Sequence, residues 1–252
     1  PHNHFYDVTD ALKRAKIEGT FLLEEEFLKI KNSLETIIAC QLFLNDEEAY
    51  PQLSRLRFMV SIDASLISAI DRIIDEKGIV RDGASPALKT IRFEIRKEQQ
   101  QLRKTLDSIF RTAKQNGFVP EGTSLTVRDG RMVVPVLAEH KRKLKGFIHG
   151  ESTTGQTVFL EPSEVLEGNN QLRELEYAER REIVKLLIKL TDSIRLQIEP
   201  LNNAYRFLGI IDFIRAKAKL AVLLNAELPT LENNASFNWK NAVHPLLFLS
   251  HK

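Results

Sequence analysis

The chain has 252 residues, of which 43% are hydrophobic and 28% are charged, which is the composition of a globular protein of one large or two small domains. A formal net charge of +2 excludes nucleic-acid binding through a strong global field, so any such binding must be local. The sequence has no apolar run long enough for a membrane span and no visible signal peptide. The single cysteine, Cys40, lies among apolar residues and cannot form an intrachain disulfide, which predicts a small buried residue in a reducing, cytoplasmic setting without a membrane partner.

Apolar residues recur at helical spacing over most of the first 117 residues and predict helices at about 9–19, 24–44 and 53–78. The next segment gives the clearest helix. Ser85 is a good N-cap, Pro86 suits the first helical position, and Gly117 suits the end. A helix of roughly 30 residues would be about 46 Å long.

The spacing of the apolar residues changes between Phe118 and Pro162, from a helical period to the alternation of a β-strand. Two β-rich runs, 124–128 and 131–136, flank Asp129-Gly130, which is a strong hairpin signal. Two further strands are predicted at about 145–149 and 156–161. Pro135 predicts that its strand lies at an edge or a bulge, because proline has no N–H to donate.

Helical spacing returns at about 163–199 and again at about 202–224, and a strand-like tail follows. The predicted fold class is therefore mainly α with a small inserted antiparallel β module, α+β overall. Two long antiparallel helices would pair along an apolar seam and carry the module at their tip. The expected parts are a helical core with an outgoing helix (1–117), the β module (118–162), a returning helix with a core helix (163–226), and the tail (227–252).

Known catalytic patterns are missing. The sequence has no H-x-x-x-H pair, no C-x-x-C and no G-x-S-x-G, so we predict no catalytic, metal or cofactor site within this chain. The segment 78–85 has the glycine spacing of a phosphate loop, but Ala84 stands where the lysine is required. It is interpreted as a turn followed by a helix cap.

One short run is strongly basic. It connects two predicted strands and contains Lys141, Arg142, Lys143 and Lys145, which on a loop at the end of an arm would reach phosphate oxygens without reading bases. Arg128 and Arg131, beside the hairpin turn, could join them. The alternative, a solvated loop, is equally compatible with the residues alone. The charges of the two long helices are interpreted as solvating and pairing the arm rather than as binding nucleic acid.

An ordered series of motifs resembles the MutS family, in the branch often called type two. The motifs cover essentially the whole chain: Gly78, Asp82-Gly-Ala-Ser-Pro86, Thr126-Val-Arg128-Asp-Gly-Arg131-Met-Val-Val-Pro135-Val, Gly146-Phe-Ile-His149, Ser152-Thr-Thr-Gly155-Gln-Thr157, Phe159-Leu-Glu161-Pro162, Asn169-Asn170, Asp212-Phe-Ile-Arg-Ala216 and His244-Pro-Leu-Leu247.

The resemblance implies core and lever helices before about 118 and after about 163, and a clamp between them that touches nucleic-acid backbone. It also implies that His244-Pro-Leu-Leu247 stands at the entry to an ATPase domain. Since the chain begins at Pro1 and stops at Lys252, it reads as a non-catalytic fragment. ATP, magnesium, a possible nuclease module and the homodimer contacts would belong to the rest of the parent protein.

Two partner classes follow from the resemblance. The first is DNA, in the form of branched or recombination intermediates, bound by a clamp that is coupled to the ATPase and suppresses recombination. The second is the ribosome, with the β module docking on ribosomal RNA or protein in a quality-control factor that splits stalled ribosomes. The residues alone do not separate the two.

Overall fold

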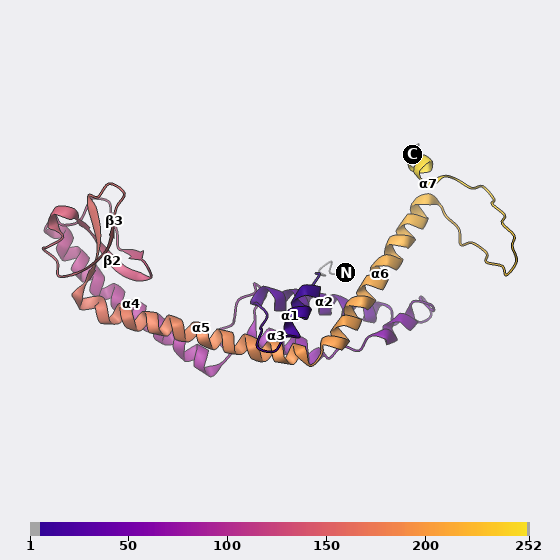
Figure 1. Cartoon of the computed structure of the whole chain (residues 1–252), viewed down its shortest axis with the longest axis horizontal. Helices are drawn as coiled ribbons and strands as arrows, with labels where there is room; N and C mark the ends of the chain where they lie inside the picture. The colour runs from indigo at the N-terminus through magenta and orange to yellow at the C-terminus, as the bar shows by residue number, and fades with distance from the viewer. Residues whose placement is uncertain (1–5, 251–252) are drawn as a thin grey trace. The chain divides into compact units, whose positions relative to one another are not determined.

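The computed structural model describes residues 6–250 (Figure 1). Pro1 and Lys252, the two terminal residues on which the fragment prediction rests, lie outside the described part. The elements follow in the order α1 (Thr9–Ala15), α2 (Glu24–Phe43), η1 (Ser54–Met59), α3 (Ala64–Ile73), α4 (Pro86–Gln115), β1 (Thr126–Arg128), β2 (Arg131–Leu137), η2 (Ala138–His140), β3 (Gly146–Glu151), β4 (Thr157–Pro162), η3 (Ser163–Val165), α5 (Leu166–Arg195), α6 (Ile198–Leu224) and α7 (Pro245–Ser250), where η marks a 3-10 helix. The predicted fold class, mainly α with a small antiparallel sheet, is confirmed.

The chain forms two compact units. The first contains Lys29–Ile67 and the chain from Leu196 onward, together with the residues up to Asp7. The second contains Val8–Leu28 and Ser68–Arg195. The second unit holds α4, α5 and the whole sheet, and therefore every residue that the sequence predicts to bind nucleic acid.

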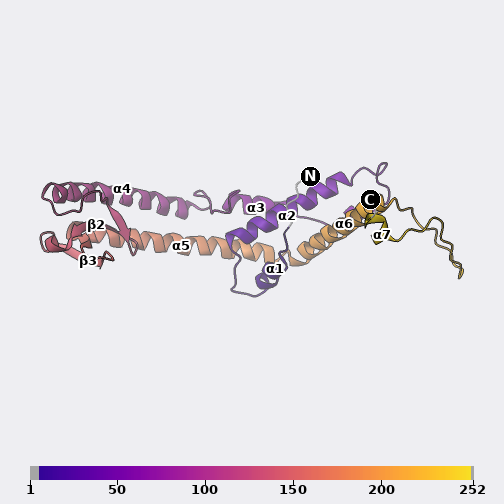
Figure 2. The ribbon, with the colours of Figure 1, turned by 90° about the horizontal axis from the view of Figure 1, so that it is seen from above.

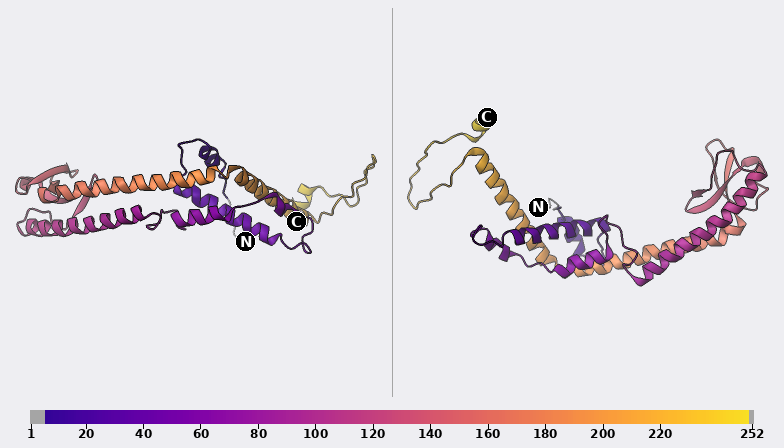
Figure 3. Two further views of the ribbon diagram at one scale, coloured as in Figure 1. Left: turned by 90° about the horizontal axis from the view of Figure 1, so that it is seen from below. Right: turned by 180° about the vertical axis from the view of Figure 1, so that it is seen from behind.

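Helices α4 and α5 lie side by side and antiparallel in the second unit (Figures 2 and 3). Each has 30 residues, so each is about 45 Å long at 1.5 Å per residue. The Ser85 hydroxyl caps α4 by accepting a hydrogen bond from the Leu88 N–H at 3.0 Å. At Gly168 the two helices approach closely, because an added Cβ would lie 2.6 Å from Leu102 Cδ2.

Charged contacts fix the end of the helix pair that lies away from the sheet. Arg92 of α4 donates to Glu179 of α5 at 2.6 Å and to Asp82 of the preceding loop at 2.5 Å. Arg96 adds a second contact to Asp82, and Ser85 donates to Glu182 at 2.9 Å. The hydrogen bonds from Arg92 and Arg96 hold the pKa of Asp82 below its ordinary value. The start of α4 is therefore tied to the middle of α5.

The sheet has the strand order β1-β2-β4-β3, with every neighbouring pair antiparallel. The predicted hairpin turn is confirmed, because Asp129 and Gly130 both have positive φ, as a type I′ turn requires. Pro135 lies in a strand that is internal in this order, yet β1 pairs only as far as Val133. Beyond that point the N–H groups on this side of β2 have no strand partner, and Leu137 donates to Phe118 O instead. The predicted edge therefore exists only locally, at Pro135 itself.

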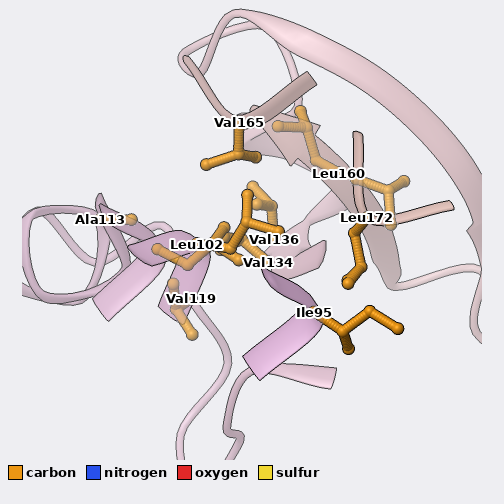
Figure 4. Packing of buried hydrophobic residues seen from close by; sticks show 11 residues of the cluster. Ile95, Leu102, Ala113, Val119, Val134, Val136, Leu160, Val165 and Leu172 are labelled. Atoms are coloured by element: carbon orange, nitrogen blue, oxygen red, sulfur yellow. The ribbon is translucent and has the colours of Figure 1, made fainter. Parts of the chain in front are cut away.

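One face of the sheet, the inner face, packs on the helices. Val134 and Val136 of β2 and Val158 and Leu160 of β4 are buried in a cluster with α4 and the start of α5 (Figure 4). At the opposite end of α5, Arg195 donates to Ala15 O of α1 at 2.7 Å. Leu172, in the cluster, and Arg195 are 23 positions apart, which corresponds to about 35 Å of helix, so the sheet and α1 occupy different ends of α5.

Two parts of the chain differ from the helices and strands that the sequence predicts. The predicted helix at 53–78 is divided into η1 and α3, because Val60 is extended and Asp63 starts a new helix by accepting from the Ser65 N–H. The side chain of Gln41 donates to the freed carbonyls of Arg57 and Val60. In place of the predicted strand-like tail, residues 226–244 have no regular structure and α7 follows, since no described strand lies there to pair with them.

Cys40 is half-buried on α2, and burial raises the pKa of its thiol, which agrees with a structural role rather than a reactive one. Between residues 6 and 250, no helix combines the length and apolar character needed to cross a membrane.

Replacement of Gly146 should destabilise the sheet. An added Cβ would lie 2.1 Å from the backbone oxygen of Glu161, which cannot move without disturbing the β3–β4 ladder. We expect Gly146→Ala to lower the free energy of unfolding by about 1–3 kcal/mol in urea titrations. The control, Gly83→Ala, meets no atom within 4 Å and should change it by less than about 0.5 kcal/mol. Equal effects of the two replacements would contradict this packing.

The contacts of Asp82 predict a pH-dependent contribution to stability. Because its pKa is lowered in the folded chain, the contribution is present at neutral pH and is lost as the carboxylate protonates, between about pH 5 and pH 3. The effect should be small, since the side chain is 55% exposed. Asp82→Asn should remove this part of the acid-induced loss, as measured by thermal unfolding across that range. An unchanged pH profile would exclude the proposed role of the contacts with Arg92 and Arg96.

Candidate nucleic-acid interface

The face of the sheet that points away from the valine cluster is called here the outer face. Directly paired residues share a face, and residues two apart on one strand share it too. The register pairs Arg128 with Arg131, Pro135 with Phe159, and Phe147 with Glu161. The outer face therefore carries Arg128 on β1, Arg131 on β2, Phe159 and Glu161 on β4, and Phe147 on β3. His149 approaches the same face through its contact with Glu161, and Lys145 directly precedes β3.

A buried carboxylate holds the centre of this face. The side chain of Glu161 has no exposed surface. Its Oε1 accepts from Arg131 at 2.7 Å and from the Asn169 amide at 2.8 Å, and its Oε2 lies 2.6 Å from His149 Nε2. An unpaired buried carboxylate would be strongly unfavourable, so these three partners are required to keep it there.

Asn169 connects the same network to α5. Its side-chain oxygen accepts from the Met132 N–H and its amide donates to the Met132 carbonyl, both at 3.2 Å. Because β4 ends at Pro162, level with Met132, the amide of Asn169 takes the place of a strand partner. Arg131 makes a further hydrogen bond to Asn170 at 2.8 Å. The first turn of α5 is thus bonded directly to β2 and β4.

The two predicted arginines of the hairpin have different environments. The guanidinium of Arg131 contacts Glu161 and Asn170, and its side chain is only 16% exposed. Arg128 is exposed, and its guanidinium carbon lies 4.1 Å from the centre of the Phe159 ring, a cation–π contact that leaves its N–H groups on the surface. Only Arg128 of this pair therefore presents donors to solvent.

The four predicted residues of the basic loop lie together and are exposed: Lys141, Arg142, Lys143 and Lys145. The backbone of the loop is ordered by hydrogen bonds, because the Lys143 N–H donates to His140 O at 2.9 Å and the Ser163 N–H donates to Lys145 O at 3.1 Å. None of these four side chains forms an ion pair with any residue in the described part of the chain. The loop leads into β3, at one edge of the sheet, whereas Arg128 lies on β1, at the other edge, and Arg131 on β2.

Sequence reasoning did not assign roles to Glu161, His149, Asn169 or Asn170, although all four fall within the motifs that resemble MutS proteins. Their spacing gave no signal, since they come from two strands and a helix. A glutamate in an otherwise apolar strand, with buried neighbours on both sides, was the one local indication that a buried ion pair was present.

Other sites were considered. No group of three or more His, Cys, Asp or Glu side chains suited to a metal ion occurs between residues 6 and 250. A hollow of about 460 Å³ lies in the first unit, with the lining residues Ile38, Gln41, Leu42, Asn45, Arg57 and Phe58. None of the predicted nucleic-acid-binding residues lines this hollow.

Neutralising the buried carboxylate should destabilise the second unit. Glu161→Gln keeps the shape of the side chain but leaves Arg131 and His149 without their charged partner, so we expect a loss of about 3 kcal/mol of unfolding free energy. The matched control is Glu139→Gln, because Glu139 is 73% exposed and its ion pair, with His140 at 3.5 Å, lies at the surface, so its loss should cost less than about 0.5 kcal/mol. If urea unfolding gave the same midpoint for both variants, the network would not have the importance assigned to it.

Comparison with known proteins places this geometry in context. No protein-family model matches the chain. Proteins named endonuclease MutS2 match it over nearly its full length: 35% identity over 242 residues in Pelotomaculum thermopropionicum, 34% over 250 residues in Alkaliphilus oremlandii, and 36% over 241 residues in Enterococcus faecalis. These alignments cover 96%, 98% and 94% of this chain but 31%, 31% and 30% of the respective relatives, so the chain spans about a third of their length. Similarity at this level along almost all of the chain supports a MutS2-type member of the MutS family.

Proposed function

We propose that this chain is the lever and clamp region of a MutS2-type protein and that it holds nucleic acid by its phosphate backbone. The β module is the clamp, and α4 and α5 are the levers. The observation that carries the proposal is the group of four exposed basic side chains on the β module, none of them paired with a described acidic residue. Such cations are available to replace the counterions of a phosphate backbone.

The environment of the basic loop supports contacts with phosphates rather than with base edges. The loop is ordered by its own backbone hydrogen bonds, while its long side chains extend into solvent. Lysine is a flexible point charge that suits phosphate oxygens, and such contacts fix position without reading sequence. Arg128, held over Phe159, adds a fifth exposed cation on the outer face. The proposed contact set is therefore the four loop residues with Arg128, while Arg131 positions the sheet through Glu161.

The lever role is supported by the way the helix pair is fastened. At one end Arg92 and Ser85 bind Glu179 and Glu182, and at the other Asn169 and Asn170 bind β2. A pair fixed at both ends moves as one body, so a displacement of its base would be transmitted to the sheet. We propose that a full MutS2-type protein acts as a homodimer. In it, ATP-driven motion elsewhere in the protein would be transmitted to the sheet through this helix pair.

We propose no catalytic step for this chain. The relatives are named endonucleases, and that activity, with the binding of ATP and magnesium, is proposed to belong to other parts of such proteins. The proposed cellular role is suppression of recombination through branched DNA. Phosphates of ribosomal RNA would meet the same cations, so the binding experiment must include both nucleic acids.

The four loop residues should determine the salt dependence of binding. If about five phosphates are contacted, log K for a four-way DNA junction should fall with log salt at a slope near −4 to −5. The full chain with all four loop residues changed to alanine should bind at least tenfold more weakly at 0.1 M salt and lose about 3–4 units of slope, as measured by fluorescence anisotropy.

The control variant changes Lys97, Arg103, Lys104 and Lys114 of α4 to alanine. Like the loop variant, it removes three lysines and one arginine, and all four are exposed side chains of the same unit. It should keep the parent slope. Equal losses in the two variants, or binding indifferent to salt, would contradict a clamp contact. Tight salt-dependent binding to ribosomal particles with weak binding to junction and duplex DNA would assign the same surface to ribosomal RNA.

A further inference from the structure

The outer edge of the sheet carries an exposed aromatic side chain within a row of cations. β3 is an edge strand, paired only with β4. Phe147, the second residue of this strand, is 56% exposed, a large fraction for an aromatic ring. Lys145 directly precedes β3, two residues before Phe147. His149 lies on the same side of the strand as Phe147, because its ring contacts Glu161, the register partner of Phe147.

The geometry of this row suits a single nucleotide. Residues two apart on a strand are separated by about 6.8 Å, so the Lys145 ammonium can reach a phosphate next to a base that lies on the Phe147 ring. His149 is held in place by its contact with Glu161 at 2.6 Å. The negative charge of Glu161 is compensated by Arg131 at 2.7 Å and the carboxylate has no exposed surface, so it does not repel a phosphate.

We propose that Phe147 stacks on an unpaired base, and that the β3 edge of the sheet therefore binds single-stranded nucleic acid more tightly than continuous duplex. The occupant is identified by charge complementarity, because the four unpaired cations of the adjacent loop select a polyanion over an apolar protein segment. In a duplex every base is already stacked on its neighbours, and the ring could contact one only after paying for its unstacking. This inference rests on the proposed function and adds to it a side chain that contacts a base rather than a phosphate.

The experiment compares Phe147→Ala with Ile148→Ala in the full chain. Ile148 is the neighbouring residue, is 45% exposed, and pairs with Leu160, so it belongs to the opposite face of the same strand. The probes are a single-stranded oligodeoxyuridylate, the corresponding oligouridylate, which differs from it only in the sugar, and a fully paired DNA duplex of the same length. Affinities are measured by fluorescence anisotropy at one salt concentration.

Phe147→Ala should weaken binding to both single strands by roughly 5- to 100-fold, while its affinity for the duplex changes less than about twofold. Ile148→Ala should leave all three affinities unchanged, and Phe147→Trp should retain or strengthen single-strand binding. A loss for only one of the two single strands would identify the sugar that the site accepts.

Unaltered single-strand affinity in Phe147→Ala overturns the inference, and so does an equal loss for duplex. A different result would show that the proposed function itself is wrong. In that case the variant with all four loop residues changed to alanine would bind every probe as tightly as the parent does. If the alanine variant did not fold, as judged by circular dichroism, the decision would rest on Phe147→Leu, which keeps an apolar side chain without a ring and should bind single strands as weakly as alanine. Phe147→Leu binding like the parent would then reject stacking.

Discussion

The buried carboxylate of Glu161 is the contact on which the rest of the second unit depends. It joins β4, which carries it, to β2 through Arg131, to β3 through His149, and to α5 through Asn169. A carboxylate with no exposed surface is tolerated only while its partners remain, so strand order and the attachment of the sheet to α5 are coupled. Apolar packing on the inner face alone would hold the sheet on the helices, but it is not directional. The hydrogen bonds of Glu161 are directional and therefore fix the orientation of the sheet.

The same contact divides the basic residues into two groups. Arg131 and His149 are oriented by Glu161, whereas the cations of the basic loop have no acidic partner in the described chain. A molecule with a formal net charge of only +2 can therefore still present a local positive surface. Screening at physiological salt limits electrostatic attraction to about 8 Å, so local arrangement matters more for binding than the total charge.

Most elements of the arm could be predicted because their signals are local. Ser85-Pro86 and Asp129-Gly130 act through the backbone of their immediate neighbours, and both behave as predicted. The division at Val60 could not be predicted, because apolar spacing remains helical across it and the compensating hydrogen bonds come from Gln41, in another helix. Likewise, the partners of Arg131 lie 30 and 39 residues away, so the sequence could place the arginine beside the turn but could not distinguish a free guanidinium from an occupied one.

The two faces of the sheet show why a small module can bind nucleic acid while remaining stable. The valines of the inner face supply the burial that holds the sheet on α4. The β3 edge takes little part in this packing and carries an exposed ring, Phe147, beside the unpaired cations of the basic loop. Since Phe147 and Ile148 are neighbours on opposite faces, replacing each in turn separates recognition from packing within one strand. The long helices place this module at one end of α5, so its outer face can meet a large polyanion without a clash from α1 at the other end.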